Sequence, residues 1–294
     1  MDTDAEPSIA NLTGARETGR SIGAILIGAG RLEFSEAERI VRFGAERGLR
    51  FGEAGIALNL LTLMDVEYAL AVQFDYPLVP RGGLGGVADE VIAAYSPHSK
   101  GVEALRALRS QLMISWIKVA DRKILTIVSP ERGEGRSWLA ANIATLLAQT
   151  GKRTLLIDAD LRNPRQHSLF NLPDAMGLTE VLTGRAVAQT VHRIHPQLRL
   201  FVLPAGTSPP NPQELLSGKV FNRMMEHCAK HFPFVLIDTP AISEAADAQI
   251  VSARAATALV VVRRNRTRHA RLTAAMQNLT HAGVKVVGTV INEH

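Results

Sequence analysis

A glycine-rich stretch in the middle of the chain has the residue types needed to bind the phosphates of a nucleotide. It reads Ser129-Pro-Glu-Arg-Gly-Glu-Gly-Arg-Ser137 and lies between a strand-like run and a helix-like segment. The backbone N–H groups of such a turn, with the N-terminal end of the helix, favour bound anions. Ser137 stands where a hydroxyl would ligate magnesium, and Arg136 stands where the usual motif has lysine. For this stretch alone, an ordinary strand-to-helix turn is the alternative.

Three aspartates could supply the acidic groups of a metal–phosphate site. Asp158 and Asp160 follow the apolar run 155–157, and alternation puts both side chains on one side of an extended tip. Asp238 ends a second apolar run, 234–237. Ligands bind at the carboxyl ends of strands in open α/β sheets, where close carboxylates repel unless a cation or a shared proton offsets their charge. A lone aspartate there could equally cap a helix, but three with the glycine-rich loop indicate a site.

The segments that would position these residues alternate between strand-like and helix-like patterns. Apolar, β-branched runs typical of strands occur at 124–128, 154–157, 200–203, 234–237, 259–262 and 284–291. Helical periodicity lies between them at 137–149, 213–229 and 270–282. Continuous apolar strands separated by helices indicate a parallel sheet covered on both faces. The expected fold class is therefore α/β, a P-loop NTPase with a doubly wound, mostly parallel sheet.

The sequence predicts four regions along the chain. Residues 1–20 are polar and rich in acidic and small residues, which is typical of a disordered N-terminus. Residues 21–79 contain a repeat offset by 29 positions, each copy a short helix, a turn and a longer helix, which predicts a small all-α module. Residues 80–97 begin with four glycines and a proline within seven positions, which predicts a linker. Residues 98–294 form the α/β nucleotide-binding domain.

The composition excludes several classes of protein. The 294 residues include 33 Lys+Arg and 28 Asp+Glu, and 46% are hydrophobic, as in globular chains rather than disordered, collagen-like or coiled-coil ones. The one cysteine, Cys228, cannot form an internal disulfide, which favours a reducing compartment. The longest apolar stretch, 54–64, is shorter than the ~18–20 residues of a membrane span, and the acidic first residues are unlike a secretory signal. We therefore expect a cytoplasmic protein.

With these motifs, residues 96–292 resemble the bacterial tyrosine kinases of polysaccharide export, in particular the chain-length-determinant protein tyrosine kinases of exopolysaccharide synthesis. The glycine-rich loop corresponds to the phosphate loop of that family, and residues 156–164 to its second Walker motif. Further matching pieces are 210–216, 236–240 and 288–292. The resemblance implies an ATP- and Mg²⁺-dependent, non-specific protein-tyrosine kinase.

The resemblance also implies a role for each residue of the site. The loop amides would cradle the β- and γ-phosphates, and the ATP-binding residues would be Gly133, Glu134, Gly135, Arg136, Ser137, Trp138 and, at the adenine, Asn292. Ser137 and Asp238 would hold magnesium. Asp158 and Asp160 would orient the attacking hydroxyl, with one of them accepting its proton, and Arg136 would be a third catalytic residue. A helix resembling the subunit-contact helix of the family carries Glu103, Arg106 and Arg109 on one face, which a solvated helix face would also explain.

Related kinases work with an inner-membrane polysaccharide chain-length regulator, often on a separate chain. The resemblance therefore implies such a partner, a homo-oligomer, and a cytoplasmic location that is peripheral to the inner membrane through the partner. Since the planar guanidinium of Arg136 is a poor substitute for a compact ammonium, a nucleotide-binding switch with weak or no catalysis is the alternative. Partition and division-site ATPases share the fold but carry a signature lysine where this chain has Glu131, which makes them a less favoured third alternative.

Two further patterns bear on the substrate and partners. The three tyrosines, Tyr68, Tyr76 and Tyr95, all precede the catalytic domain, so a substrate tyrosine is expected on another protein or at Tyr95. Five arginines follow a predicted strand, at positions 263, 264, 266, 268 and 271. They could contact an acidic tail, lipid headgroups or nucleic acid, or form a solvated face. Because no aromatic residues are interleaved, we expect no nucleic-acid partner.

The N-terminal module resembles the N-terminal domain of type II secretion ATPases, in which a repeated motif opening with Arg-Leu-Gly and closing with Gln can bind cyclic di-GMP. Residues 50–52 and Gln73 fit this motif, whereas Ser21 replaces its other arginine. The loss of one arginine removes a bidentate phosphate contact. We therefore expect a protein-contact role, with cyclic di-GMP binding as the alternative.

Overall fold

The computed structural model describes residues 21–74, 77–79, 86–116, 124–173, 176–185 and 190–293. The chain divides into two compact units, Met1–Pro77 and Leu78–His294. The expected disordered N-terminus and the glycine-rich start of the expected linker, 80–85, lie outside the described residues. None of the helices in the described part has the length and apolar composition needed to cross a membrane.

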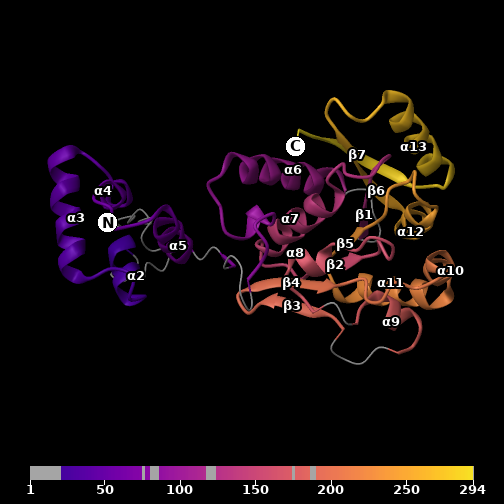
Figure 1. Ribbon diagram of the computed structural model, residues 1–294, viewed down its shortest axis with the longest axis horizontal. Coiled ribbons are helices and arrows are strands. Elements are labelled where there is room, and N and C mark those ends of the chain that lie inside the picture. Colours follow the sequence, from indigo (N-terminus) through magenta and orange to yellow (C-terminus); the bar gives the residue numbers. More distant parts are fainter. Residues whose placement is uncertain are drawn as a thin grey trace, which may run out of the picture. The chain divides into compact units, whose positions relative to one another are not determined.

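The first unit consists of two copies of a short helix followed by a longer one. The first copy contains α2 (Ile22–Gly28) and α3 (Phe34–Arg47), and the second contains α4 (Phe51–Ala57) and α5 (Leu63–Gln73) (Figure 1). Corresponding helices begin 29 residues apart, at 22 and 51 and at 34 and 63, which confirms the predicted repeat. An ion pair of 3.1 Å between Arg31 and Asp65 joins the turn of the first copy to α5 of the second.

The turn inside each copy has the same backbone conformation. Gly30, with φ +66°, and Asn59, with φ +56°, occupy equivalent positions in the left-handed region, which glycine and asparagine tolerate best. Leu32 and Leu61 follow at equivalent positions, and both are buried. The helices close over a small apolar core to which each contributes, with Leu26, Ile40, Ala54 and Ala69 at its centre.

The second unit contains a seven-stranded sheet with the order β3-β4-β2-β5-β1-β6-β7. The strands are β1 (Ile124–Val128), β2 (Thr154–Asp158), β3 (His192–His195), β4 (Leu198–Leu203), β5 (Phe234–Asp238), β6 (Thr257–Arg263) and β7 (Lys285–Asn292). Only the β3–β4 pair is antiparallel in the described part of the sheet; the others are parallel. The expected α/β fold with a mostly parallel sheet is confirmed.

Two local features differ from the sequence expectation. Strand β3 was not predicted because it reads His-Arg-Ile-His, in which Ile194 alone is buried, rather than as an apolar run. The helix expected at 213–229 is divided into α10 (Pro212–Ser217) and α11 (Lys219–His231). The break falls at Gly218, whose extended backbone ends one helix and begins the next.

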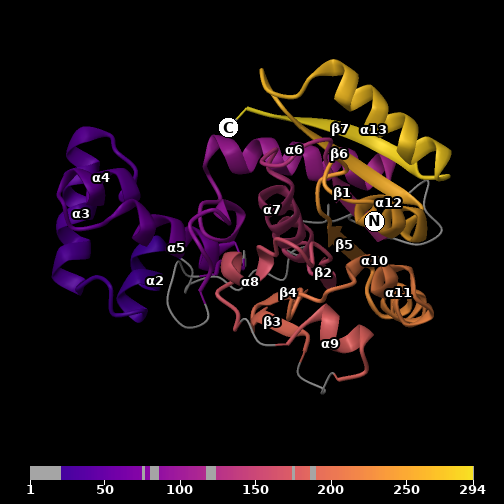
Figure 2. The ribbon, with the colours of Figure 1, turned by 45° about the vertical axis from the view of Figure 1, so that its right-hand side comes forward.

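Helices cover both faces of the sheet (Figure 2). On one face, α6 (Lys100–Ser115) and α7 (Arg136–Ala148) share a core with alternate strand residues such as Leu125 and Leu156. On the other face, α11 and α12 (Asp247–Ala255) pack on their strand neighbours, such as Ile124 and Leu155. Helix α13 (His269–His281) packs beside α12 and β7, and the short α8 (Gln166–Leu169) and α9 (Leu178–Leu182) follow β2.

The segment after residue 86 packs into the second unit. Val87, Val91 and Tyr95 are buried in the core that contains α7, and a short helix, η1 (Ile92–Ala94), lies among them. Asn142 of α7 fixes this segment, because its side chain accepts a bond from the Ala93 amide and donates one to the Glu90 carbonyl, each 2.9 Å long. This part of the expected linker is thus a packed element, since its valines and alanines cover α7.

Candidate functional site

The glycine-rich loop joins β1 to the N-terminus of α7 at the carboxyl edge of the sheet. Gly133 (φ +76°) and Gly135 (φ +94°) adopt the left-handed backbone that favours glycine. A Cβ atom at Gly135 would lie 2.2 Å from Nδ2 of Asn292, so this position cannot accommodate a side chain without a shift. The loop therefore leads into a buried helix by a turn without side chains at its two glycines, the arrangement that suits a bound phosphate.

Side chains inside and beside the loop hold its shape. The carboxylate of Glu134 is fully buried and accepts hydrogen bonds from the Glu131 amide, at 2.9 Å, and from the Thr267 hydroxyl. At the end of β7, Nδ2 of Asn292 donates to the Glu134 carbonyl at 3.1 Å. Glu134 and Asn292 were expected to contact ATP, and in this structure their side chains brace the loop. An adenine contact of Asn292 stays a prediction.

Arg136, at the position of the usual lysine, is folded back against the protein. Its guanidinium donates from Nε to the Thr239 carbonyl at 2.8 Å, and from Nη1 to the Glu131 carbonyl at 3.0 Å and to the Ser129 hydroxyl. Nη2 lies 3.9 Å from a carboxylate oxygen of Asp160. With 7% of its surface exposed, Arg136 connects the start of the loop to the ends of β2 and β5.

Asp158 shapes the turn that follows β2. It is fully buried and lies directly opposite Asp238 in the register of β2 and β5. Oδ1 accepts the Asp160 amide at 3.1 Å, while Oδ2 accepts the amides of Arg165 and Gln166 at 3.0 and 2.9 Å. Burial, followed by the charge of Asp238, raises the pKa of Asp158 well above its ordinary value. Its carboxyl group is thus engaged by backbone amides.

Asp160 differs from Asp158 because it lines the cavity beside the loop. One carboxylate oxygen accepts the amides of Asn163 and Arg162 at 2.9 and 3.3 Å, and the other faces Arg136. Burial raises the pKa of Asp160, although these hydrogen bonds and the Arg136 charge act in the opposite direction. Of the two aspartates predicted to orient a hydroxyl, Asp160 is therefore the one placed to meet a ligand.

Asp238, at the end of β5, is fully buried and has one oxygen without a hydrogen-bond partner among the described residues. Oδ2 accepts a 2.8 Å hydrogen bond from the Gln166 side chain, but Oδ1 is buried and has no hydrogen-bond partner among the described residues. Burial raises the pKa of Asp238 to about 6, and the Arg136 charge, the nearby Ser137 hydroxyl and the hydrogen bond from Gln166 oppose this.

These groups fit a magnesium ion. A carboxylate oxygen without a donor, beside a serine hydroxyl, offers the hard oxygen ligands that Mg²⁺ prefers. Within the described ranges, no cluster of three or more His, Cys, Asp or Glu side chains could hold a metal. Mg²⁺ typically takes one or two protein oxygens and completes its shell with phosphates and water. Ser137 and Asp238 remain the proposed ligands.

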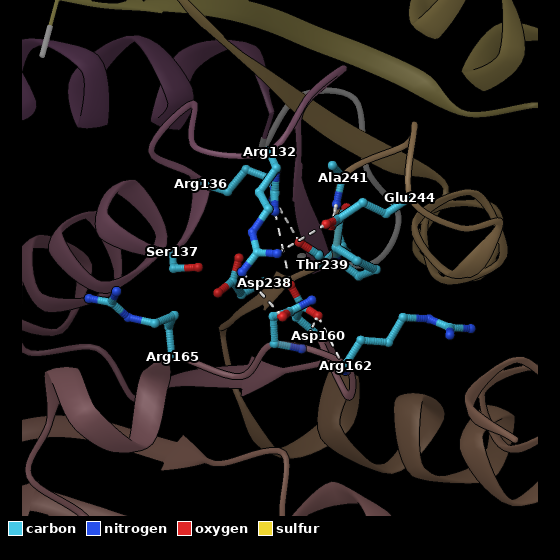
Figure 3. A network of polar contacts seen from close by, with 12 residues as sticks. Arg132, Arg136, Ser137, Asp160, Arg162, Arg165, Asp238, Thr239, Ala241 and Glu244 are labelled. Atoms are coloured by element: carbon cyan, nitrogen blue, oxygen red, sulfur yellow. Dashed lines mark hydrogen bonds and ion pairs between the residues drawn. The ribbon is translucent and has the colours of Figure 1, made fainter. Parts of the chain in front are cut away.

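A cavity of about 430 Å³ brings these residues together (Figure 3). Its walls include Gly133, Gly135, Ser137 and Trp138 from the loop and the start of α7, and Asp160 from the turn after β2. Arg132 and Arg165 also line it, and each pairs with a glutamate of the same lining, Glu244 at 3.8 Å and Glu90 at 3.4 Å, so the rim carries charges of both signs. Of the predicted site residues, Gly133, Gly135, Arg136, Ser137, Trp138 and Asp160 line this cavity, whereas Glu134, Asp158, Asp238 and Asn292 do not.

Several residues of the site were missed by the sequence analysis. Gln166 is fully buried and bonds to Asp238, although nothing except its position eight residues after Asp158 marked it. Part of the arginine run lies against the phosphate loop, since Arg263 donates to the Gly133 carbonyl at 3.4 Å and Arg271 pairs with Glu131 at 3.3 Å. Arg162, in contrast, extends away from the cavity (Figure 3) and pairs with Asp247 at 2.8 Å.

The expected oligomer-contact residues lie on α6, as predicted, but differ in exposure. The side chain of Glu103 is 74% exposed, whereas that of Arg106 is 24% exposed and donates to the Pro97 carbonyl at 2.6 Å as well as to Glu103. Arg109 donates to the Leu146 carbonyl at 3.4 Å. A role in subunit contact stays a prediction for all three, and Glu103 is the most accessible.

Tyr95, considered as a substrate on the linker side, is not available for phosphorylation in this conformation. Its ring is 8% exposed, and its hydroxyl donates to the Asp89 carbonyl. Tyr76 lies outside the described residues, and Tyr68 stacks under the Arg31 guanidinium at 4.3 Å. An accessible acceptor tyrosine is therefore expected on another polypeptide.

The N-terminal unit has a cavity of its own, of about 850 Å³. Its walls are mainly apolar and include Ile22, Phe34, Val41 and Phe51, with Gln73 at one side. Of the residues that fit the cyclic di-GMP motif, Phe51 and Gln73 line it. Binding of a ligand or of a protein at this cavity stays a prediction.

The comparisons with known proteins match the second unit. Residues 125–294 match the model of the CobQ/CobB/MinD/ParA nucleotide binding domain. The tyrosine-protein kinase Ptk of Acinetobacter johnsonii is 36% identical over 203 residues, which are 69% of this chain but 28% of that protein. The putative tyrosine-protein kinase CapB of Staphylococcus aureus is 35% identical over 197 residues, 67% of this chain and 86% of CapB.

A solved structure agrees with these sequence matches. The kinase domain of the Escherichia coli tyrosine kinase ETK superposes with a TM-score of 0.66 at 29% identity, covering 74% of this chain and 89% of that domain. The chain therefore spans most of a kinase domain, but little more than a quarter of a long relative such as Ptk. The matched family region begins well after the helical N-terminal unit.

Proposed function

Because this chain belongs to the CobQ/CobB/MinD/ParA nucleotide-binding family and, within it, to the bacterial tyrosine kinases, we propose that it is an ATP- and Mg²⁺-dependent protein-tyrosine kinase that regulates exopolysaccharide polymerisation and export. The observation that carries the proposal is a cavity lined by the phosphate loop, with Ser137, and by Asp160, while the buried Asp238 is joined to the Ser137 carbonyl through the Gln166 side chain. Phosphoryl transfer needs these three elements: a phosphate cradle, metal ligands and a group that orients the acceptor.

Each element has a defined task in the proposed reaction. The loop from Gly133 to Trp138 would hold the β- and γ-phosphates. Ser137 and Asp238 would hold Mg²⁺, which supplies the positive charge that stabilises the phosphate oxygens. Asp160 would accept a hydrogen bond from the tyrosine hydroxyl and then its proton. Because burial raises the pKa of Asp160, its basicity is increased, which favours this general-base role.

The acceptor tyrosine and the partner are proposed from the family. We place the tyrosine on another polypeptide, because Tyr95 is buried. The partner would be an inner-membrane chain-length regulator on a separate chain, holding the kinase at the cytoplasmic side of that membrane. A homo-oligomer would use the α6 face that bears Glu103.

Arg136 supports a second candidate, a nucleotide-binding switch with weak catalysis or none. Three hydrogen bonds to Thr239, Glu131 and Ser129 hold its guanidinium. A group held in this way cannot follow a phosphoryl group during transfer as a flexible lysine can. In this candidate function, the nucleotide state would control assembly with the membrane regulator without phosphorylation.

One experiment distinguishes these functions. The purified full chain is incubated with γ-labelled ATP, Mg²⁺ and a random Glu–Tyr copolymer as the tyrosine substrate, with Asp160→Ala as the control. Phosphotyrosine that disappears in Asp160→Ala supports the kinase. Nucleotide binding without label in either protein would favour the switch, and hydrolysis stimulated by DNA or lipid vesicles without phosphotyrosine would favour a partition-type ATPase. Absence of nucleotide binding would overturn all three.

A further inference from the structure

Gln166 connects three parts of the site although no motif includes it. It is the first residue of α8 and is fully buried. Its Nε2 donates to the Ser137 carbonyl at 3.1 Å and to Oδ2 of Asp238 at 2.8 Å, while its backbone amide donates to Asp158 at 2.9 Å. One side chain thus joins the phosphate loop to the carboxylate at the end of β5.

The orientation of the Gln166 amide follows from its neighbours. The Asp238 carboxylate and the Ser137 carbonyl can only accept hydrogen bonds unless the acid is protonated. A flipped amide would place Oε1 against two acceptors, so Nε2 must face them and Oε1 must point elsewhere. The orientation of Oε1, away from Asp238 and the Ser137 carbonyl, is therefore fixed by the need of these two acceptors for a donor.

The oxygen left over in this way has no partner. Across the described ranges, four buried side-chain polar atoms lack a hydrogen bond, and two of them are Oε1 of Gln166 and Oδ1 of Asp238. These two acceptors belong to side chains that are bonded to each other. Unsatisfied buried acceptors are rare, and each calls for an explanation such as an ion or ordered water. Two unsatisfied acceptor oxygens on hydrogen-bonded side chains next to a phosphate loop point to a hydrated cation at this place.

We propose that Gln166 is a positioning residue of the magnesium site. By holding Oδ2 of Asp238 and the main chain of Ser137, it fixes the two proposed metal ligands relative to each other and leaves Oδ1 of Asp238 free for the cation. Its own Oε1 is an acceptor for water bound to that cation. The inference rests on the proposed function, since it assumes that nucleotide binds with Mg²⁺.

The test measures how strongly Mg²⁺ increases nucleotide affinity, and not turnover. The dissociation constant of ADP is determined by calorimetry for the full chain in excess Mg²⁺ and in EDTA, and the ratio of the two values is the readout. Gln166→Met removes the amide at nearly constant length. Gln149→Met is the matched control, because the Gln149 side chain also donates a partly buried hydrogen bond, to the Ala93 carbonyl at 2.8 Å, and Gln149 does not line the cavity.

For Gln166→Met, we expect the Mg²⁺-to-EDTA affinity ratio to fall at least fivefold, with less than a twofold change of affinity in EDTA. Gln149→Met should keep the wild-type ratio. Gln166→His, which keeps one N–H donor, should recover part of it, and it serves as the test if Gln166→Met does not fold.

An unchanged ratio in Gln166→Met, or in Gln166→His if that variant must be used, would overturn the positioning role while leaving the proposed function intact. If the wild type itself bound no ADP, or bound it equally well in Mg²⁺ and EDTA, the premise would fail and the inference with it. An equal loss of affinity in Mg²⁺ and EDTA would show a purely structural role and would also overturn the proposal.

Discussion

The guanidinium of Arg136 is bonded to the main chain at the end of β5, with Nε 2.8 Å from the carbonyl oxygen of Thr239. This bond ties the residue at the usual lysine position to the strand that carries Asp238. Arg136 therefore has a structural task, fastening the loop to the sheet, in addition to the catalytic role expected from the sequence.

We predict opposite effects of Arg136→Lys on stability and on phosphotransfer. A lysine cannot replace all the donors to Thr239, Glu131 and Ser129, so thermal unfolding should show a loss of about 1–3 kcal/mol. The freed ammonium can follow the transferring phosphate, so phosphotyrosine formation should rise by roughly tenfold or more. A variant that is as stable as the wild type, or that gains no activity, would contradict this account of Arg136.

The two aspartates after β2 should separate into different phenotypes. Asp158→Ala removes the acceptor of three amides, so chemical denaturation should show a loss of about 2–3 kcal/mol. Asp160→Asn keeps an oxygen for its two amides but cannot take a proton. It should keep its stability and lose phosphotransfer by roughly 10²–10⁴-fold. A stable Asp158→Ala variant together with an active Asp160→Asn variant would contradict the structural role of Asp158 and the catalytic role of Asp160.

Nucleotide binding with Mg²⁺ should depend on pH through Asp238. Burial raises the pKa of this carboxyl to about 6, and a metal binds the ionised form. At pH 5 only about a tenth of the groups would be ionised, so Mg²⁺-dependent ADP affinity should fall about tenfold between pH 7.5 and pH 5. Affinity in EDTA should change less, and Asp238→Asn should remove the difference between the two titrations. An affinity in Mg²⁺ that is flat across this range would contradict the role of Asp238.

The same pKa has a consequence for stability without ligand. A carboxyl whose pKa is raised on folding binds its proton more tightly in the native state than in the unfolded state. Protonated Asp238 therefore stabilises the fold below the unfolded pKa of 3.8, and this stabilisation is lost as the pH rises towards about 6. The wild type should therefore lose stability relative to Asp238→Asn between pH 4 and pH 6. Denaturation curves of both proteins, measured in EDTA, would show a constant difference if the native carboxyl were not perturbed.

The start of α5 in the N-terminal unit depends on one acidic residue. Asp65 accepts bonds from the Thr62 amide and hydroxyl, at 3.0 and 2.6 Å, and pairs with Arg31 of the first repeat at 3.1 Å. Asp65→Ala should destabilise this helix by about 1 kcal/mol, seen as faster hydrogen exchange of the amides in α5. Met64→Ala, at a 57% exposed position of the same helix, is the control. Equal exchange rates in both variants would show that the cap is unimportant.

The motifs predicted the positions of the main site residues because they depend on local backbone rules. Glycines at 133 and 135 predict a turn with left-handed backbone. Aspartates at the ends of apolar runs are expected at the carboxyl edge of a parallel sheet. Strand β1 was predicted with its exact bounds, Ile124–Val128, because a strand buried on both faces has a continuous apolar sequence.

What the sequence could not predict depends on side-chain packing between distant segments. The hydrogen bond from Arg136 to Thr239 joins residues 103 positions apart in the sequence, and that from Gln166 to Asp238 joins residues 72 positions apart. A glutamine in a helix start has no pattern that reveals its partner. The packing of 87–95 was also missed, because the neighbouring glycines dominated the local composition although Val87 and Val91 are fully buried.

The most direct test of the central claim is calorimetric titration of the full chain with ADP in the presence of Mg²⁺. The account predicts saturable binding at one site per chain, strongly weakened in Gly135→Ala, where the new Cβ atom would collide with the Asn292 amide. No heat of binding up to millimolar nucleotide, or identical binding in Gly135→Ala, would contradict a nucleotide site at this loop.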